Sequence, residues 1–391
     1  MIRENFLTAL AARAARIPFA LAASSAFVPP QKALILHPCC LSQVMLATPL
    51  LAALQTTYPQ TRFDWAVSDW ARAAIISNPR ITELIRTAPG DIHDLSWREL
   101  GAFIQQLRDQ NYDTCFIPSR STLLAYVAWR SKIPQRIGLN VNGRGFAHSI
   151  AVKKPTNATH TTALYLALAS AANVPEDTIQ NVSMEFIPPD RDRTAVTRRL
   201  IEEVDWLGDV PLVLMHPGGG VNPIQSNELK RWPIERFTLL ANHCIEKHLA
   251  KVVLVGTETE RPLTKAIDGM LAGKITNLAG RLNLGELGAM CEVADLYIGN
   301  DAGPTHIAAA TGCPTLAIYG PSDPVLSRPY TQKGKLITLW HDASGVEEER
   351  PFSWDIGVGI DKAIAAVDKL LAENIENESS LPYLTSLKQG T

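Results

Sequence analysis

The stretch "DLYIGNDAGPTHIAAATGCPTLAIYG", residues 295–320, predicts a strand, a helix and a second strand in direct succession. Its two ends are short apolar runs bounded by turn residues, as in buried strands, and its alanine-rich middle is typical of a helix. Pro304 fits the first turn of that helix because it has no N–H to leave unpaired, and Gly312 fits its end. We therefore expect a helix from about Pro304 to Thr311 within a parallel α/β sheet.

The same alternation of strands and helices runs through the rest of the chain. Strand-like runs occupy 32–38, 62–68, 81–87, 112–119, 211–220, 251–257 and 275–280. Helix-like runs occupy 42–59, 233–249, 262–271 and 284–294. This pattern favours open parallel sheets, whose ligands bind beyond the carboxyl ends of the strands.

The length of 391 residues favours two domains, and the proline pair in "EFIPPDRDR" (185–193) marks a credible linker. Four apolar side chains share one face of a final helix: Ile364, Val367, Leu370 and Leu371. We expect that face to pack on a neighbouring surface. The expected divisions are an N-terminal extension at 1–30, a first domain at 31–187, a second domain at 188–360, and a helix with a tail at 361–391.

The composition argues against several classes of protein. The formal net charge is −2, so the chain as a whole gives no electrostatic reason to bind nucleic acid. Its six cysteines show no C-x-x-C pair and no interleaved histidine spacing. This pattern disfavours a zinc site or a disulfide framework and favours buried thiols in a reducing compartment. No apolar run approaches the roughly 20 residues that a membrane-spanning helix needs.

The first 30 residues combine Arg13 and Arg16 with the apolar run "IPFALAASSA". This arrangement imitates a signal peptide, but Pro18 interrupts the short apolar part. Two interpretations stay open: an amphipathic helix resting on a membrane surface, or a loosely held terminal extension. We expect a cytoplasmic protein, with or without peripheral contact to the inner membrane.

The predicted helix start at Pro304 is suited to binding an anion. Its free N–H groups and partial positive charge, with Gly303 leaving the backbone open, favour a phosphate. His306 in the first turn can donate to a phosphate oxygen, whereas Asp301 suits the hydroxyls of a sugar. The alternative is structural, with Asp301 as an N-cap and His306 as a buried or capping group.

A second set of candidate residues follows the strand-like run at 211–220. Gly218 and Gly219 let a ligand approach the backbone closely, although their spacing is not that of a P-loop. Lys230 precedes another helix start at Pro233, where a positive charge is unfavourable unless an anion lies nearby. Two such helix starts predict a diphosphate ligand, while a solvated lysine is the alternative.

The run at 251–257 ends in a third set. Thr257 and Glu260 have the spacing of a capping box, so we expect Glu260 to be structural. Glu258 projects from the same strand end and is the better candidate to accept hydrogen bonds from a ribose.

Acidic residues are absent from Thr114 to Pro175, and the segment is rich in basic ones. Its cations are Arg120, Arg130, Lys132, Arg136, Arg144, Lys153 and Lys154. This segregation predicts attraction of an anionic acceptor or a membrane surface, with Arg120, Arg136 and Arg144 as acceptor-binding candidates. An ordinary basic face is the alternative. Nucleic acid is disfavoured because interleaved aromatic residues and RNA-binding motifs are missing.

The run "LGELGAMCEVADLYIGNDAGPTHIAAATGCPTLAIYGPSDP" (284–324) strongly resembles the C-terminal signature of the heptosyltransferase family, glycosyltransferase family 9. Further stretches look like the family's landmarks in the same order: "KALILHPCCLSQVMLATPLLAAL", "YPQTRFDWAVS", "RIGL" and "KRWPIERF". The likeness covers roughly residues 32–370. It implies an α/β protein with the GT-B fold, in which two Rossmann-like parallel-sheet domains face a central cleft.

The resemblance also implies a function. Family members transfer a sugar from a nucleotide-diphosphate donor to lipopolysaccharide core or a related anionic glycan, with inversion and without a metal or other cofactor. Carried over by position, the residues holding the donor's sugar and diphosphate would be Asp301, Ala302, Gly303 and His306. Lys230 would neutralise the leaving diphosphate, and Glu258 would hold the ribose.

One departure from the family concerns the catalytic base. Members usually carry a Gly-Asp pair after the first strand, whose Asp deprotonates the acceptor, and here the pair is Ser42-Gln43. Gln43 cannot accept a proton at working pH. His37, at the same strand end, is the nearest replacement, unless it is a plain strand-end residue. The alternative function is therefore a catalytically weakened protein that binds a sugar nucleotide.

Overall fold

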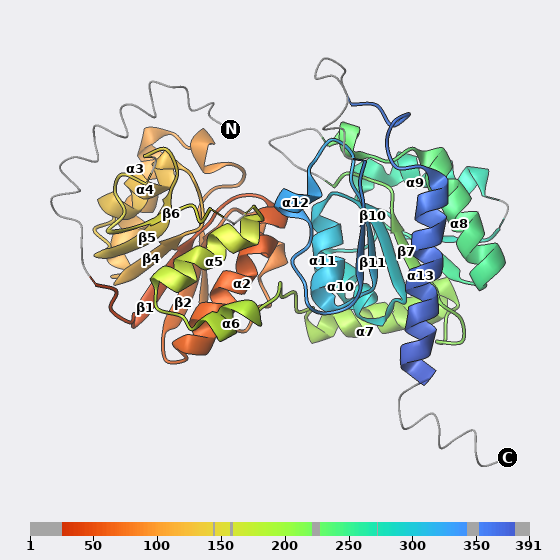
Figure 1. The fold of residues 1–391 in the computed structure, drawn as a ribbon, viewed down its shortest axis with the longest axis horizontal. Helices are drawn as coiled ribbons and strands as arrows, with labels where there is room; N and C mark the ends of the chain where they lie inside the picture. The colour runs from red at the N-terminus through yellow and green to blue at the C-terminus, as the bar shows by residue number, and fades with distance from the viewer. Residues whose placement is uncertain are drawn as a thin grey trace, which may run out of the picture. The chain divides into compact units, whose positions relative to one another are not determined.

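The computed structural model of the chain describes residues 26–143, 145–156, 159–220, 227–271, 273–341 and 352–379. These residues form two compact units, each with its own parallel sheet (Figure 1). The first unit ends at Glu185 and also includes Val325–Gln332, and the second contains the rest. Residues 1–25 of the expected N-terminal extension lie outside the described residues.

The first unit is built on a sheet with the strand order β3-β2-β1-β4-β5-β6. Its strands are β1 (Lys32–Leu36), β2 (Arg62–Val67), β3 (Glu83–Arg86), β4 (Thr114–Ile117), β5 (Gln135–Asn140) and β6 (Ile150–Lys153). Its helices are α2 (Leu41–Thr57), α3 (Trp97–Asp109), α4 (Thr122–Arg130), α5 (Thr161–Ala171) and α6 (Glu176–Gln180), with single turns η1 (Arg72–Ala74) and η2 (Ile92–Asp94). β1 is buried from Ala33 to Leu36, as expected of a central strand covered on both faces.

Helices lie on both faces of this first sheet (Figure 1). α2 packs against α5, whereas α3 and α4 share a hydrophobic core with β1 and β4. α3 begins with a capping box formed by Ser96 and Glu99, and it buries Leu100, Phe103 and Leu107 on one face. The packing fixes the start of α2 and the segment after β4 at the carboxyl edge of the sheet.

The second unit repeats this architecture with the strand order β12-β11-β10-β7-β8-β9. Its strands are β7 (Leu212–His216), β8 (Lys251–Leu254), β9 (Thr276–Asn277), β10 (Leu296–Asn300), β11 (Thr315–Ile318) and β12 (Leu336–Leu339). Its helices are α7 (Asp190–Arg199), α8 (Ile234–His248), α9 (Arg261–Met270), α10 (Leu284–Val293), α11 (Gly303–Thr311) and α13 (Ile360–Ser379), with short turns η3 (Leu200–Val204), η4 (Glu228–Lys230) and η5 (Glu258–Glu260).

Two hydrophobic cores form on opposite faces of the second sheet, because successive strand residues point to opposite sides. Val213 and Met215 of β7 join a core with α8, α9 and α13. Leu212 and Leu214 of the same strand join a core with α7, α10 and α11. Figure 1 shows these two sets of helices on either side of the sheet.

The helix predicted inside the opening stretch is confirmed. α11 runs from Gly303 to Thr311 with proline in its first turn, and Gly312 ends it in the left-handed conformation with φ of 96°. The strands before and after it, β10 and β11, pair in parallel within one sheet. This stretch is therefore the strand–helix–strand unit that its composition predicts.

The final helix also packs as predicted. Val367, Leu370 and Leu371 of α13 are buried against the second sheet, and Ile364 lies at the margin of that core. α13 is therefore part of the second unit rather than a separate element. Among the described helices, none has both the length and the apolar composition needed to cross a membrane.

Three strands were not predicted from the sequence: β5, β6 and β12. β6 and β12 are four-residue edge strands that stay half-exposed. β5 opens with the polar residues Gln135 and Arg136. Short or polar strands of this kind become recognisable only through their pairing with neighbours.

The segment Val325–Gln332 differs from its expected assignment. The sequence placed it in the second domain, but it groups with the first unit. The backbone N–H of Met184 donates to the carbonyl of Tyr330 at 3.0 Å, and His160 Nε2 lies 2.9 Å from the carbonyl of Arg328. The short helix α12 (Pro324–Ser327) leads into this segment. These long-range backbone contacts have no local sequence signal.

The cysteines follow the prediction in part. Cys115, Cys244, Cys291 and Cys313 are buried thiols. Cys39 and Cys40 instead form a disulfide between adjacent residues, so the expectation of thiols throughout is wrong for this pair. The turn that leads from β1 into α2 brings the two neighbouring sulfur atoms together, and a pair of adjacent cysteines has no spacing of the C-x-x-C kind.

Candidate active site

The carboxyl ends of β7 and β10 lie side by side and carry the residues predicted to bind the donor. The two strands pair with Gly299 opposite His216, so the segments that follow them are neighbours. The buried Asn300 connects these segments: its Nδ2 donates to the carbonyls of Pro217 and Gly218, both at 2.9 Å. Its Oδ1 accepts the backbone N–H of Trp232 at 3.1 Å. One amide side chain therefore positions the glycine loop and the segment leading into α8.

The glycine loop, residues Gly218 to Gly220, is held in place by the buried carboxylate of Glu260. Its Oε1 accepts the backbone N–H of Gly220 at 2.8 Å, and its Oε2 lies 3.1 Å from Nε2 of His216. Oε2 also accepts the backbone N–H of Thr257 at 2.9 Å and its hydroxyl at 3.0 Å. A side chain at Gly218 would collide with Glu260, so this glycine is required by a protein contact.

Glu260 is ionised by this arrangement. Burial alone would raise its pKa, but hydrogen bonds from His216, Thr257 and Gly220 outweigh that effect and hold the pKa well below its ordinary value. The predicted capping box between Thr257 and Glu260 is confirmed. The sequence did not reveal that the same carboxylate also anchors the glycine loop, because the two lie 40 positions apart in the chain.

Lys230 and Asp301 form a close ion pair beside the start of α11. Lys230 Nζ lies 2.6 Å from Asp301 Oδ2, and 25% of the lysine side chain and 7% of the aspartate side chain are exposed. The N-cap of α11 is Ala302 and has no side-chain cap, so the alternative in which Asp301 is the N-cap is wrong. The structure therefore brings together two residues that the sequence singled out for the donor.

The start of α11 completes this group. Gly220 adopts a φ of +72°, and a side chain at this position would meet Ala302 and Pro304, so the glycine loop runs beside the helix start. Gly303 is the first residue of the helix, whose N-terminus carries a partial positive charge. His306 in the first turn is buried, with 1% of its surface exposed. We call the set formed by the glycine loop, Lys230, Asp301 and the start of α11 the donor half-site.

Glu258 lies at the adjacent strand end, in η5. Its side chain is 66% exposed and pairs with Arg261 one turn later at 3.0 Å. A side chain at Gly280, whose φ is +76°, would collide with Glu258, so this glycine follows the backbone of η5 closely. Glu258 is therefore accessible to a ligand, and its role at the ribose stays a prediction.

A pocket of about 270 Å³ lies at the carboxyl edge of the first sheet. Its walls come from the ends of β1, β4 and β5 and from α2 and α5: His37, Cys39, Cys40, Gln43, Ser119, Arg120, Leu139, Thr161, Leu164 and Tyr165. Three residues that the sequence proposed separately, His37, Gln43 and Arg120, therefore share one cavity. We call it the β1 pocket.

His37 is the buried titratable group of the β1 pocket. Only 5% of its surface is exposed, and its ring meets that of Tyr165 edge-on at 5.4 Å between centroids. Burial lowers the pKa of His37 from 6.5 to about 4, against a smaller opposing effect of the Gln43 backbone. Neither ring nitrogen makes a well-formed hydrogen bond with a described residue. His37 is therefore a neutral imidazole with unused hydrogen-bonding capacity at neutral pH.

Gln43 occupies the position at which the sequence resemblance leads us to expect an aspartate base. Tyr165 Oη donates to Gln43 Oε1 at 2.8 Å, which orients the amide. Burial raises the pKa of Tyr165, and the positive charge of Arg120 opposes that shift. Tyr165 was not predicted, because within the apolar run "TTALYLALASA" it has the appearance of an ordinary core residue.

The sequence model of glycosyltransferase family 9 (heptosyltransferase) matches residues 100–351. The chain belongs to this family. The predicted activity class, a glycosyltransferase, is thereby confirmed.

Relatives and solved structures agree with the family assignment. Lipooligosaccharide heptosyltransferase 2 of Haemophilus influenzae is 27% identical over 78% of this chain and 88% of its own. The crystal structure of a family 9 glycosyltransferase from Veillonella parvula superposes with a TM-score of 0.75 at 19% identity, covering 89% of this chain and 100% of the other. The Escherichia coli ADP-heptose lps heptosyltransferase II superposes with a TM-score of 0.67 at 21% identity, covering 88% and 99%. These likenesses confirm the predicted GT-B fold of two Rossmann-like sheets.

The three arginines predicted to bind the acceptor have different surroundings in this glycosyltransferase. Arg120 is exposed at the β1 pocket. Arg136 lies near the start of β5, away from the carboxyl edge, and its guanidinium donates to the backbone carbonyls of Ile133, Pro134 and Ala147. Its Nε and Nη1 are engaged by the backbone, which favours a structural role, and the acceptor contact of Arg136 stays a prediction. Arg144 lies outside the described residues.

Proposed function

We propose that this glycosyltransferase moves a heptose-like sugar from a nucleotide-diphosphate donor, ADP-heptose in the first instance, to a hydroxyl of lipopolysaccharide core or a related anionic glycan. We further propose that the transfer inverts the anomeric centre and needs no metal ion. The relatives' names support the acceptor class, and the name of the E. coli neighbour supports the donor. The observation that carries the proposal is the pairing of Lys230 with Asp301 at the start of α11.

The donor half-site offers the charges that a diphosphate needs. The ammonium of Lys230 and the N-terminus of α11 both favour an anion. Among the described residues, Asp301 is the carboxylate that contacts Lys230. A diphosphate that takes over the lysine therefore frees this carboxylate to accept hydrogen bonds from sugar hydroxyls. When the donor binds, Lys230 can thereby exchange Asp301 for the diphosphate, and Asp301 can exchange Lys230 for the sugar.

The β1 pocket supports a role in binding the acceptor and removing its proton. Arg120 gives the pocket a positive charge, which suits an anionic glycan. His37 is neutral at pH 7, the form that accepts a proton. Its pKa lies below the operating pH at which a general base works best. A bound anion would raise that pKa, because a negative charge favours the imidazolium form.

The proposed reaction balances without a further reactant. An acceptor hydroxyl gives its proton to His37, and its oxygen forms the new bond to the anomeric carbon. The bond from that carbon to the diphosphate breaks, and its electron pair leaves with the diphosphate oxygen. Lys230 and the N–H groups of α11 stabilise the charge that develops there, a term that commonly dominates such rate enhancements.

A second candidate function is favoured by one observation. Gln43 stands where the family has its base and is oriented by Tyr165. If His37 does not act as the base, the protein binds a sugar nucleotide with little turnover. The donor half-site would then serve recognition rather than catalysis.

A transfer assay with the purified protein tests both candidates. We expect ADP-heptose and a heptose-acceptor glycan to yield ADP and a product of inverted anomeric configuration, detected by chromatography and NMR, in the presence of EDTA. Donor binding without transfer, combined with turnover in Gln43→Asp, would favour the second candidate. Failure to bind any of a panel of ADP, UDP and GDP sugars in a thermal-shift screen would refute both.

A further inference from the structure

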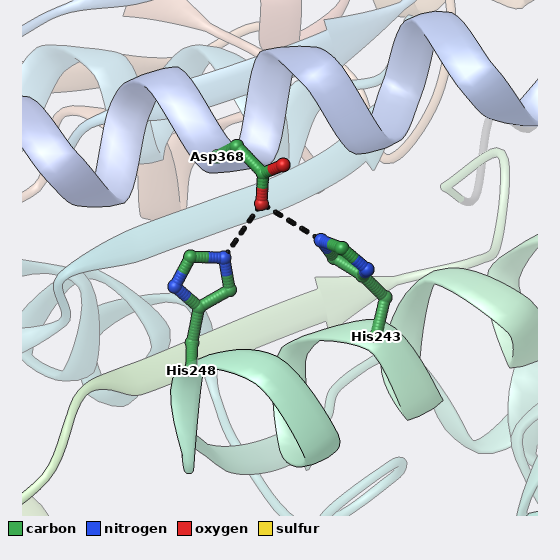
Figure 2. Close-up of side chains that lie close together, drawn as sticks. All are labelled: His243, His248 and Asp368. Carbon is green, nitrogen blue, oxygen red and sulfur yellow. Dashed lines mark hydrogen bonds and ion pairs between the residues drawn. The ribbon is translucent and has the colours of Figure 1, made fainter.

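A cluster of two histidines and one aspartate joins α8 to α13, outside the donor half-site and the β1 pocket. Nε2 of His243 and Nε2 of His248 each lie 2.7 Å from the same oxygen, Oδ1 of Asp368. Figure 2 shows the carboxylate reaching down from α13 between the two imidazoles, which rise from α8. The three candidate ligand atoms all lie within 4.8 Å of one another.

The side chains of this cluster are the ligand types that a borderline transition-metal ion prefers. Imidazole nitrogen and carboxylate oxygen bind Zn²⁺ at about 2.0–2.2 Å, and three protein ligands leave a fourth position for water. In a tetrahedral site such ligand atoms lie about 3.3 Å apart, so each nitrogen has to withdraw from Oδ1 by about 0.6 Å. Rotation of the side chains can supply that movement, because both rings approach the oxygen from separate turns of α8.

The electrostatic setting also favours a cation. His248 is the last residue of α8, and the C-terminal end of a helix carries unpaired carbonyls and a partial negative charge. Asp368 supplies a carboxylate whose Oδ1 already faces both imidazoles and can act as an anionic ligand.

Lys247 occupies the second oxygen of the carboxylate. Its Nζ lies 2.7 Å from Oδ2 of Asp368, which leaves Oδ1 facing the histidines. Metal-ligating carboxylates are commonly oriented by such a hydrogen bond on the other oxygen. The lysine side chain is 56% exposed, so it can also move away when a cation binds. His243 and His248 are 18% and 15% exposed, which leaves the cluster reachable from solvent.

We propose that His243, His248 and Asp368 bind a divalent zinc-type metal ion that links α13 to α8. The ion replaces the two hydrogen bonds to Asp368 Oδ1 with three coordinate bonds. Each imidazole binds as a neutral ring through Nε2, so the proton that Nε2 donates to Oδ1 in the metal-free protein moves to Nδ1 or to solvent. Because α13 buries its apolar face on the second sheet, the ion would stabilise the docking of this helix. Its role is structural.

This site is separate from the proposed chemistry. α8 begins at Ile234, four residues after Lys230, and His248 stands at its other end. A helix of 15 residues spans about 22 Å, so the metal would lie far from the donor half-site. A structural zinc ion at this distance is compatible with metal-independent transfer, and each proposal can be tested without the other.

Zinc binding to the full-length protein tests the proposal. The protein is treated with EDTA, desalted and titrated with Zn²⁺ by calorimetry, with Tm followed in parallel. We expect one equivalent to bind and to raise Tm, while Mg²⁺ has no such effect. His248→Gln and Asp368→Asn should each weaken binding at least about a hundredfold, since even outer-shell changes commonly cost 10–100-fold. Glu246→Gln, an exposed change on the same turn of α8, is the matched control and should bind like wild type.

The titration is run in a Cys39→Ser/Cys40→Ser background, because this half-buried pair of sulfur atoms would compete for the metal if its disulfide were reduced. Equal affinity in Asp368→Asn and Glu246→Gln, or no zinc bound at micromolar concentration, would overturn the proposal. If the ligand variants fail to fold, the visible absorption spectrum of the Co²⁺ complex of the Cys39→Ser/Cys40→Ser protein tests the assignment instead. Visible bands of a nitrogen and oxygen site support the assignment, and thiolate charge-transfer bands or no bands contradict it.

Discussion

Replacing Glu260 by glutamine keeps the size of the side chain and removes the charge that holds the glycine loop. The carboxylate accepts hydrogen bonds from Gly220, His216 and Thr257, and only 2% of its surface is exposed. An amide has one acceptor oxygen and an NH2 group that only donates. If the oxygen keeps the bonds from Thr257, the NH2 group faces the N–H of Gly220 and that bond is lost. The variant should therefore loosen the loop beside the donor half-site.

The expected loss of stability follows from these contacts. A hydrogen bond to a charged group contributes about 1.5–3 kcal/mol, and a buried donor left without a partner adds to its loss. With one such bond lost and the others weakened, we expect a loss of about 3 kcal/mol. For a unit of this size, each kcal/mol lowers Tm by about 2–4 °C, so Tm should fall by about 6–12 °C. A loosened loop should also raise the Kd for the donor by about tenfold, which corresponds to about 1.4 kcal/mol.

Thermal unfolding of wild type and Glu260→Gln at several pH values measures this loss. The folded-state pKa of Glu260 is lowered, so its stabilising effect is complete above the unfolded value of about 4.3 and fades as the pH falls below it. The difference in Tm between the two proteins should therefore shrink in acid. Glu258→Gln is the control for the Tm measurement, because that exposed carboxylate makes a surface ion pair expected to contribute less than about 1 kcal/mol. Equal Tm and equal donor affinity in wild type and Glu260→Gln would refute the reasoning.

Three further outcomes are expected. Asp301→Ala and Lys230→Ala should each weaken donor binding or transfer more than about tenfold, which corresponds to about 1.4 kcal/mol. Lys230→Ala leaves the buried carboxylate of Asp301 unpaired, so the double variant should unfold at a higher temperature than this single variant. Wild type should lose up to about 3 kcal/mol of its free energy of unfolding between pH 6.5 and 4, because the His37 imidazole takes up a proton there in the unfolded state and not in the folded one. His37→Gln should lack this loss, and urea denaturation in which both proteins lose the same stability across that range would contradict the prediction. Arg120→Glu should raise the acceptor KM at unchanged donor affinity, whereas Arg136→Ala should lower Tm because it removes hydrogen bonds to the backbone. A raised acceptor KM in Arg136→Ala together with a lowered Tm in Arg120→Glu would contradict these roles.

That the residues of the donor half-site lie together was largely predictable, because they flank strand ends and helix starts within short stretches. Asp301 and Gly303 come directly after β10, and Lys230 comes directly before a helix start marked by Pro233. In a parallel sheet all such strand ends lie at one edge, so topology alone brings these segments close together. The β1 pocket was predictable only in part: His37 and Arg120 follow strand ends, but their contact with Tyr165 does not follow from local pattern.

The sequence by itself determined the alternation of strands and helices, the family, and the strand ends that carry charged or glycine residues. Local composition suffices there, because helix starts, helix ends and buried strands depend on neighbouring residues. Only the tertiary structure decided which side chains meet: Glu260 with the glycine loop, Gln43 with Tyr165, Arg136 with the backbone around it, and Asp368 with two histidines of α8. Apart from those of Arg136, which reach residues 2 to 11 positions away, these contacts join residues far apart in the chain. Each depends on the direction in which a side chain leaves its element. That direction is set by packing on the two sheets.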